Sequence, residues 1–377
     1  MRDFAFGSGN PDPGSFPWQG LIDAAAKILP EVGESLVLYP DQRGYLPLRE
    51  LAAERYKKNN GIQLPVENIA LTAGSMQAIS LICQAFIQPG DTIMVEEYCY
   101  VGSLNCFRKF QANMVGVKVD DDGMNIDDLE VKLKDLLARG IKPKFIYVIA
   151  SNQNPTGTMM PESRRQRLVD IAKEHDVLIV DDDCYADLLF GLDAPRSIHS
   201  LDPEAGGIYI GSFSKILGPG VRLGYFAAKE ETLQKVLYWK IDGGTSNLSA
   251  AIAAEYFKQH MWEHVEDING IVREKLELLQ ATLAQHPKSF LEWSHPKGGL
   301  FIWIKLPEDV DPIRLQELAN AQGIRYGTGK SFHTRNEDIK YLRLAFGYVS
   351  HDDIRDGLPI LADCVQQARG IAVAAST

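Results

Sequence analysis

Lys215 follows two serines, Ser212 and Ser214, and precedes an arginine, Arg222, a spacing that could support covalent chemistry. Residues 211–222 read GSFSKILGPGVR. A lysine amine that lies near other positive charge, or away from water, loses its proton more easily and can form a Schiff base with a carbonyl compound. Ser212, Ser214 and Arg222 could bind a phosphate through their hydroxyl groups and a planar guanidinium. Taken alone, the pattern fits a surface lysine in a loop equally well.

Two turns that contain glycine offer further polar groups. Gly74-Ser75-Met76-Gln77 precedes a helical pattern, so its backbone N–H groups and the Ser75 hydroxyl could receive a phosphate at a helix N-terminus. A plain N-cap serine is the commoner explanation of that motif. Asn154-Pro155-Thr156-Gly157 follows an apolar strand pattern, and Asn154 could donate to an anionic oxygen, although a simple turn fits equally well.

Three consecutive aspartates, Asp181–Asp183, follow another apolar run. They fit a metal site, a solvated loop or a partner for a protonated ring nitrogen, and no other ligands nearby in the sequence favour a metal. A carboxylate beside a pyridinium keeps the ring electron-poor, and Tyr185, three residues beyond Asp182, could reach the far side of the same ring. A Schiff-base lysine beside a phosphate cradle is what pyridoxal 5'-phosphate (PLP) requires.

Arg343 interrupts the otherwise apolar run Tyr341–Phe346. A buried arginine requires a partner, and bidentate pairing with a carboxylate is its strongest use. Three alternatives stay open at this point: a bound carboxylate, an ion pair between domains, and the outward face of an edge strand.

The elements that must position these residues alternate along the chain. From about residue 45 to 230, short apolar runs alternate with amphipathic helical patterns, which predicts a mainly parallel sheet covered on both faces. Ligands bind at the carboxyl ends of the strands in such sheets, where Asn154 and Asp182 fall. Helices are expected from Ser75 to a stop before residue 89, and from Pro161 to His175. The expected strands are Thr92–Glu96, Met114–Val119, Phe145–Ala150, Val177–Val180, Ile208–Ser212 and Leu223–Ala227.

The pattern changes after residue 230. A long helix is expected over about residues 250–285, followed by a strand over 298–304, another helix and further strands that include 341–346. The first three dozen residues carry too few apolar side chains to fold alone. We therefore predict a large domain over 40–250 and a smaller α+β domain built from 1–39 and 251–377, with residues 371–377 as a frayed tail.

Composition and charge disfavour several classes of protein. The 377 residues carry a formal net charge of −11 at pH 7, and such a field repels nucleic acids and anionic membranes. No apolar run is long enough to span a bilayer, and the amino end lacks the zones of a secretory signal. Five widely spread cysteines without a C-x-x-C pair fit reduced thiols and none of the usual zinc patterns. We expect a cytoplasmic protein without a metal.

The motifs, in this order along the chain, strongly resemble the fold-type I PLP-dependent aminotransferases of class I and II. Within that family the sequence is similar to the α-aminoadipate and kynurenine aminotransferases and to the aminotransferase-like half of MocR regulators. The resemblance runs from Gly9-Asn10-Pro11 to Arg343 and depends on the ordered set, since each motif alone is weak. It implies a large domain with a mainly parallel seven-stranded sheet between helices, plus a smaller α+β domain.

The resemblance also implies how PLP is held. Lys215 would form the Schiff base and move the proton of the substrate's Cα, while Asp182 would pair with the pyridine nitrogen. Tyr185 and Asn154 would hydrogen-bond the 3'-oxygen of the ring, and Tyr100 would stack on the ring face. The residues implied at the phosphate or close to it are Gly74, Ser75, Met76, Ser212, Ser214 and Arg222.

The same resemblance implies the substrate contacts and the assembly. Arg343 would bind the α-carboxylate of the substrate, and Gly9 and Asn154 would line the substrate pocket. Tyr39 matches the tyrosine that reaches the phosphate of the neighbouring subunit, which implies a homodimer with shared sites.

Transamination is the implied reaction, with an L-amino acid and a 2-oxo acid as substrates and ping-pong kinetics. Two alternatives stay open. The same cofactor could support elimination, replacement, cyclisation or oxidation, because Tyr98, Cys99, Cys184 and Thr328 depart from the family pattern near the rim of the pocket. The chain could also be a non-catalytic effector module of a regulator, which the acidic charge and the expected lack of a preceding winged-helix domain disfavour.

Overall fold

Seven strands form the main sheet of the protein, in the order β1-β9-β8-β7-β6-β2-β3. In the computed structural model, which describes residues 2–191 and 194–370, β8, β7, β6, β2 and β3 run parallel, and β9 is antiparallel to β1 and β8. The strands are β1 (Ile69–Thr72), β2 (Thr92–Glu96), β3 (Asn113–Val117), β6 (Phe145–Val148), β7 (Leu178–Asp182), β8 (Ile208–Ser212) and β9 (Gly224–Ala227). The predicted fold class is confirmed, while the predicted frayed tail lies outside the described residues.

Helices cover both faces of this sheet, as the two-sided apolar pattern of its strands requires. In β6, Phe145 and Tyr147 contact Phe107 of α4 on one face. The alternate residues Ile146 and Val148 join a second apolar cluster with α5 and α6 on the other face. The helices around the sheet are α2 (Leu46–Asn60), α3 (Ser75–Phe86), α4 (Val101–Lys109), α5 (Ile126–Ala138), α6 (Glu162–Glu174), α7 (Ile198–Leu201) and α8 (Glu230–Leu237). Within the described ranges, no helix has both the length and the apolar character that crossing a membrane demands.

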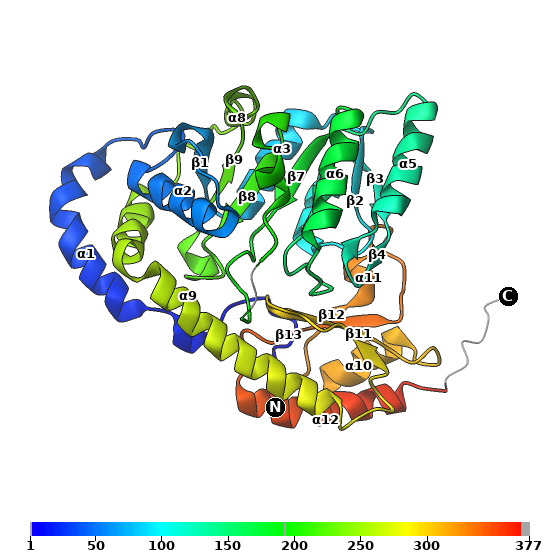
Figure 1. Ribbon diagram of the computed structural model, residues 1–377. Helices are drawn as coiled ribbons and strands as arrows, with labels where there is room; N and C mark the ends of the chain where they lie inside the picture. The colour runs from blue at the N-terminus through cyan, green and yellow to red at the C-terminus, as the bar shows by residue number, and fades with distance from the viewer. Residues whose placement is uncertain (1, 192–193, 371–377) are drawn as a thin grey trace.

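A second, four-stranded antiparallel sheet has the order β10-β11-β13-β12. The 37-residue helix α9 (Asn247–Leu283) runs from the large sheet down to this smaller one, and α1 (Trp18–Val32) packs along it (Figure 1). The remaining elements are β4 (Val119–Asp120), β5 (Gly123–Met124), β10 (Glu292–Trp293), β11 (Phe301–Lys305), α10 (Pro312–Ala321), β12 (Gly327–Thr328), α11 (Gly329–Phe332), β13 (Tyr341–Ala345) and α12 (His351–Gln367). The division into domains over 40–250 and over 1–39 with 251–377 stays a prediction.

Several expected strands are shorter than predicted: β6 ends at Val148, β9 begins at Gly224 and β13 ends at Ala345. Two further differences have a visible cause. The strand expected over Met114–Val119 ends at Val117, where the backbone N–H of Lys118 donates to the Asp128 carboxylate at 2.8 Å instead of continuing the ladder. The strand expected from residue 298 begins at Phe301. A Cβ atom on Gly299, whose φ is +73°, would lie 2.7 Å from Cβ of Asn152, so this segment is a tight turn against the loop that follows β6.

Candidate active site

A cavity of about 180 Å³ lies where β7 and β8 end, at Asp182 and Ser212. This is the edge at which parallel α/β sheets bind ligands, because loops from neighbouring strands diverge there. The residues that line it are Asn10, Ser75, Met76, Tyr100, Ile149, Asp182, Cys184, Tyr185, Ser212, Ser214, Lys215, Pro219 and Arg222.

Lys215 follows β8 and turns its amine into this cavity. Its Nζ donates to the backbone carbonyl of Gly9 at 2.8 Å and lies 5.6 Å from the centre of the Tyr185 ring. Burial lowers the pKa of Lys215 to about 8 because the charged ammonium is removed from water. A substantial fraction of the amine is therefore neutral near pH 8, which is the form that attacks a carbonyl.

An anion-binding end forms at the start of α3. Gly74 precedes the helix without a capping side chain, so the N–H groups of the first turn point out with the positive end of the helix dipole. The guanidinium of Arg222 lies against them, held by hydrogen bonds to the carbonyl oxygens of Pro219, at 2.9 Å, and Ala73. A Cβ on Gly74, whose φ is +84°, would strain the backbone and lie 2.6 Å from Nη2 of Arg222, so a larger residue would displace the guanidinium. Backbone amides, serine hydroxyls and a guanidinium are a donor set that fits a phosphate.

Asp182 supplies a buried carboxylate at the other end of the cavity. Its Oδ2 accepts a hydrogen bond from the Tyr147 hydroxyl, whereas its Oδ1 is buried and has no hydrogen-bond partner among the described residues. Burial raises the pKa of Asp182, and hydrogen bonds from Cys184 and Tyr147 lower it. An unpartnered buried acceptor costs free energy unless a donor reaches it. The protonated nitrogen of the PLP ring is such a donor, so the site fits this cofactor at both ends.

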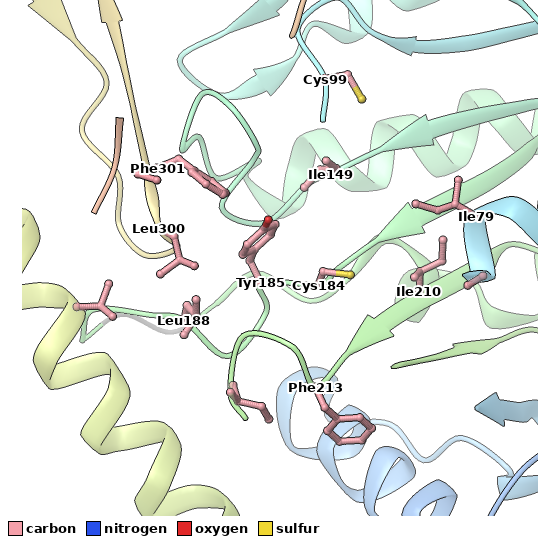
Figure 2. Close-up of a cluster of buried hydrophobic side chains, with 14 of the residues drawn as sticks. Ile79, Cys99, Ile149, Cys184, Tyr185, Leu188, Ile210, Phe213, Leu300 and Phe301 are labelled. Carbon is pink, nitrogen blue, oxygen red and sulfur yellow. The ribbon is translucent and has the colours of Figure 1, made fainter. Parts of the chain in front are cut away.

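Aromatic and apolar side chains enclose the space between the two ends. Figure 2 shows Tyr185 among Ile149, Cys184 and Leu188, with Phe301 of β11 opposite. The Tyr185 and Phe301 rings meet edge to face, with centroids 5.4 Å apart and an interplanar angle of 79°. This packing connects the loop after β7 with the smaller sheet and excludes water from that side of the cavity.

Arg343 is buried beside the cavity without an ionic partner among the described residues. Its Nη1 donates to Asn154 Oδ1 at 3.0 Å and its Nη2 to the carbonyl of Gly7 at 2.6 Å, and Nε has no hydrogen-bond partner in the described ranges. Its guanidinium carbon lies 4.4 Å from the ring centre of Phe301 and 4.7 Å from that of Phe332. Burial lowers the pKa of Arg343 to about 10. An ion pair between domains and an outward-facing edge position therefore do not describe this residue.

The N-terminal segment crosses the site as a strap, which we define as residues 7–12. The carbonyls of Gly7 and Gly9 accept from Arg343 and Lys215, and Asn10 lines the cavity. Asp12 pairs with the buried amine of Lys275 in α9, which fixes the far end of the strap.

The structure brings most of the predicted site residues together. Those that line the cavity are Ser75, Met76, Tyr100, Asp182, Tyr185, Ser212, Ser214, Lys215 and Arg222, and Gly74, Gly9, Asn154 and Arg343 adjoin them. Tyr39 lies elsewhere, with 91% of its surface exposed. Sequence reasoning missed Asn10, Ile149, Pro219 and Gly7 as members of the site. Ile149 could have been found, because it belongs to the strand expected just before Asn154.

The described residues contain no group of three or more His, Cys, Asp or Glu side chains arranged to hold a metal ion. Asp181, Asp182 and Asp183 alternate across β7 and its end, so only Asp182 reaches the cavity. The three aspartates therefore do not form one site.

Comparison with known proteins places these features in context. The family model described as "Aminotransferase class I and II" matches residues 3–358. Aromatic-amino-acid aminotransferase 1 of Thermococcus litoralis is 34% identical over 362 residues, which cover 95% of this chain and 87% of that protein. The crystal structure of LysN, the α-aminoadipate aminotransferase of Thermus thermophilus, complexed with N-(5'-phosphopyridoxyl)-L-leucine, matches with a TM-score of 0.89 at 32% identity, over 97% of this chain and 92% of that one. The HTH-type transcriptional regulator YdfD of Bacillus subtilis is 31% identical over 324 residues, 85% of this chain and 65% of the regulator.

Proposed function

Since this chain belongs to the class I and II aminotransferase family and is a PLP-dependent aminotransferase, we propose that its cavity transfers amino groups from L-amino acids to 2-oxo acids through the residues described above. The observation that carries this assignment is the buried Lys215 amine between an anion-binding helix end and an unpartnered Asp182 carboxylate oxygen. The predicted family is confirmed by the comparisons, while the role of each residue is part of the proposal.

PLP, when bound, supplies an aldehyde that captures the amino group and a ring that accepts the electron pair left on the substrate's Cα. Ser75, the Met76 amide and Arg222 would bind the phosphate, with Gly74, Ser212 and Ser214 close around it. Asp182 Oδ1 would accept from the ring nitrogen, Tyr185 and Asn154 would donate to the 3'-oxygen, and Tyr100 would cover one face. Each of these groups lies in or beside the cavity.

Lys215 is the residue that moves the proton. Its buried amine, with a pKa of about 8, is a suitable base for the Cα proton near neutral pH. The hydrogen bond to the Gly9 carbonyl holds Nζ inside the cavity, and it is released when the amine reacts. The edge-to-face packing of Tyr185 and Phe301 covers one side of this space and limits exchange of the proton with solvent. Release of the 2-oxo acid requires one water molecule to enter from another side.

Arg343 binds the α-carboxylate of the substrate. Its two amino groups share one edge of a planar fork, and Asn154 and the Gly7 carbonyl already hold the guanidinium in place. An arriving carboxylate supplies the negative charge that this buried cation lacks. Gly9, whose carbonyl accepts from Lys215, lies two residues along the strap from Gly7, whose carbonyl accepts from Arg343, so we place Gly9 beside the substrate.

A homodimer with shared sites accounts for an exposed apolar patch on the outside of the chain. The patch contains Val37, Leu38, Tyr39, Tyr238 and Ile241, which are 69–92% exposed. Gly243 lies against the Tyr39 ring, so the two runs of exposed residues adjoin. Exposed apolar patches of this kind mark interfaces, and a second copy would place Tyr39 at the phosphate of its partner.

The five free, buried cysteines suit a cytoplasmic location.

Half-reaction spectroscopy tests the proposed reaction. An L-amino acid added alone to the PLP-bound protein should replace the PLP absorption with that of pyridoxamine phosphate and release one 2-oxo acid per site. Addition of a different 2-oxo acid should reverse the change. Release of ammonia without an acceptor would instead support elimination, and no spectral change with any amino acid would contradict catalysis.

A further inference from the structure

Two buried side chains, those of Ser103 in α4 and Tyr147 in β6, form a chain of hydrogen bonds that ends at Asp182. Tyr147 in β6 donates its hydroxyl proton to Asp182 Oδ2, and its hydroxyl oxygen lies 2.8 Å from Oγ of Ser103 in α4. Ser103 and Tyr147 are fully buried, and neither belongs to the cavity wall. No motif in the sequence draws attention to either residue.

Counting protons fixes the direction of both hydrogen bonds. An ionised carboxylate can only accept, so Tyr147 must donate its single proton to Asp182. The Tyr147 oxygen can then only accept from Ser103, and Ser103 must donate. Both O–H dipoles therefore point toward the carboxylate, and each bond strengthens the other in this low-dielectric interior.

The hydrogen bond from Tyr147 occupies one carboxylate oxygen of Asp182 and leaves the other, Oδ1, free. Oδ2 is occupied by Tyr147, while Oδ1 is buried and has no partner in the described part of the chain. Burial alone favours the neutral acid, which pairs poorly with a protonated ring, and hydrogen bonds from Cys184 and Tyr147 oppose that tendency.

We infer that Tyr147, supported by Ser103, is a positioning residue that keeps the Asp182 carboxylate ionised and turned so that Oδ1 faces the ring nitrogen of PLP. The inference rests on the proposed role of Asp182. Tyr147 acts only through Asp182, since it does not line the cavity.

The next residue along the chain provides a matched control. Asp183 is also buried, and its Oδ2 accepts from the hydroxyl of a buried tyrosine, Tyr209, at 3.2 Å. Asp183 does not line the cavity, because its side chain lies on the opposite face from Asp182. Tyr147→Phe and Tyr209→Phe thus make the same chemical change at adjacent carboxylates, only one of which faces the cofactor.

The test uses holoprotein prepared with PLP labelled with ¹⁵N in its ring. The ¹⁵N chemical shift reports whether the ring nitrogen is protonated, and titration of the apoprotein with PLP gives its dissociation constant. Tyr147→Phe should move the shift toward the unprotonated value and weaken PLP binding roughly tenfold, equivalent to about 1.4 kcal/mol. Ser103→Ala should act in the same direction by about threefold, because Tyr147 remains but loses its donor. Tyr209→Phe should leave the shift and the dissociation constant unchanged.

Asp182→Asn separates this inference from the function on which it rests. If Asp182→Asn shifts the ring nitrogen and Tyr147→Phe does not, the inference about Tyr147 is wrong and the role of Asp182 stands. If Asp182→Asn also leaves the shift unchanged, Asp182 is not the ring partner and the proposed assignment fails first. Should Tyr147→Phe not fold, Ser103→Ala decides, since a wild-type shift and dissociation constant in that variant would overturn the inference.

Discussion

Replacement of Arg343 by methionine separates recognition of a carboxylate from a structural role of the buried cation. Methionine keeps an unbranched apolar chain between the rings of Phe301 and Phe332, where the guanidinium now lies. It removes the donors to Asn154 and Gly7, both of which are neutral oxygens. No carboxylate of the described residues loses a partner, but the buried Asn154 oxygen loses its donor, so Arg343→Met should lower the free energy of unfolding by about 1–3 kcal/mol.

Loss of the contact between Arg343 and the substrate carboxylate should lower kcat/KM strongly. A hydrogen bond to a charged group contributes about 1.5–3 kcal/mol, and a guanidinium that grips a carboxylate by two such bonds contributes about 3–6 kcal/mol. Each 1.36 kcal/mol is a factor of ten, so kcat/KM for an L-amino acid should fall roughly 10²- to 10⁴-fold.

The assay compares an L-amino acid that the protein uses with the amine that lacks its carboxylate, in single-turnover half-reactions. The wild-type protein should prefer the amino acid, and Arg343→Met should remove most of that preference while reaction with the amine changes little. Arg108→Met is the control, because Arg108 also donates to two backbone carbonyls, those of His333 and Thr334 at 3.2 Å, but adjoins no part of the cavity. An unchanged preference in Arg343→Met would refute the carboxylate assignment.

Three further changes test other parts of the structure. Burial lowers the pKa of Lys215 to about 8, and only the neutral amine reacts, so stopped-flow absorbance should show that apoprotein captures PLP faster as the pH rises through 8. After borohydride reduction, peptide mapping of Lys215→Ala should find no PLP fixed to the chain. Arg55→Met should lower the free energy of unfolding by about 3–5 kcal/mol in urea titrations, since it leaves the buried Asp187 carboxylate without its cation. Burial raises the pKa of Glu96 from 4.5 to about 8, so the protonated side chain stabilises the fold fully below pH 4.5 and this stabilisation is lost as the pH rises to 8. Between pH 5 and pH 8 the free energy of unfolding of Glu96→Gln should therefore rise relative to that of the wild type, by up to about 1.4 kcal/mol per pH unit. A difference that stays constant with pH would contradict this.

The parts of the site that depend on local pattern are predictable from the sequence. Strand ends and helix starts are marked by apolar runs and by glycine, so the pattern alone places Ser75, Asp182 and Ser212 at one edge of the sheet. The helix expected from Ser75 begins there, and the strands expected over Thr92–Glu96 and Ile208–Ser212 have those bounds. Local signals are sufficient for these residues because each one follows directly from the element before it.

Contacts between distant segments could not be predicted in this way. Tyr147 reads as an ordinary apolar strand residue, and only the pairing of β6 with β7 brings its hydroxyl to Asp182. Asn154 and Arg343 are 189 positions apart, and the hydrogen bond between them depends on how the smaller sheet meets the larger one. The alternatives for Arg343 stayed open in the sequence for the same reason, because a strand pattern does not reveal what faces it. β1 (Ile69–Thr72) was not among the expected strands.

Two buried guanidinium groups of this chain, those of Arg55 and Arg343, differ in whether the fold supplies an anionic partner. Arg55 and Asp187 are both buried and satisfy each other in an ion pair, so the fold is able to neutralise an internal guanidinium. Arg343 is similarly buried, yet among the described residues it receives only neutral acceptors and keeps Nε unpartnered. Leaving a buried cation without an anion costs stability that a nearby carboxylate would restore. The proposed substrate carboxylate would complete the pair and offset that cost, so the contrast between Arg55 and Arg343 supports the carboxylate-binding role proposed for Arg343.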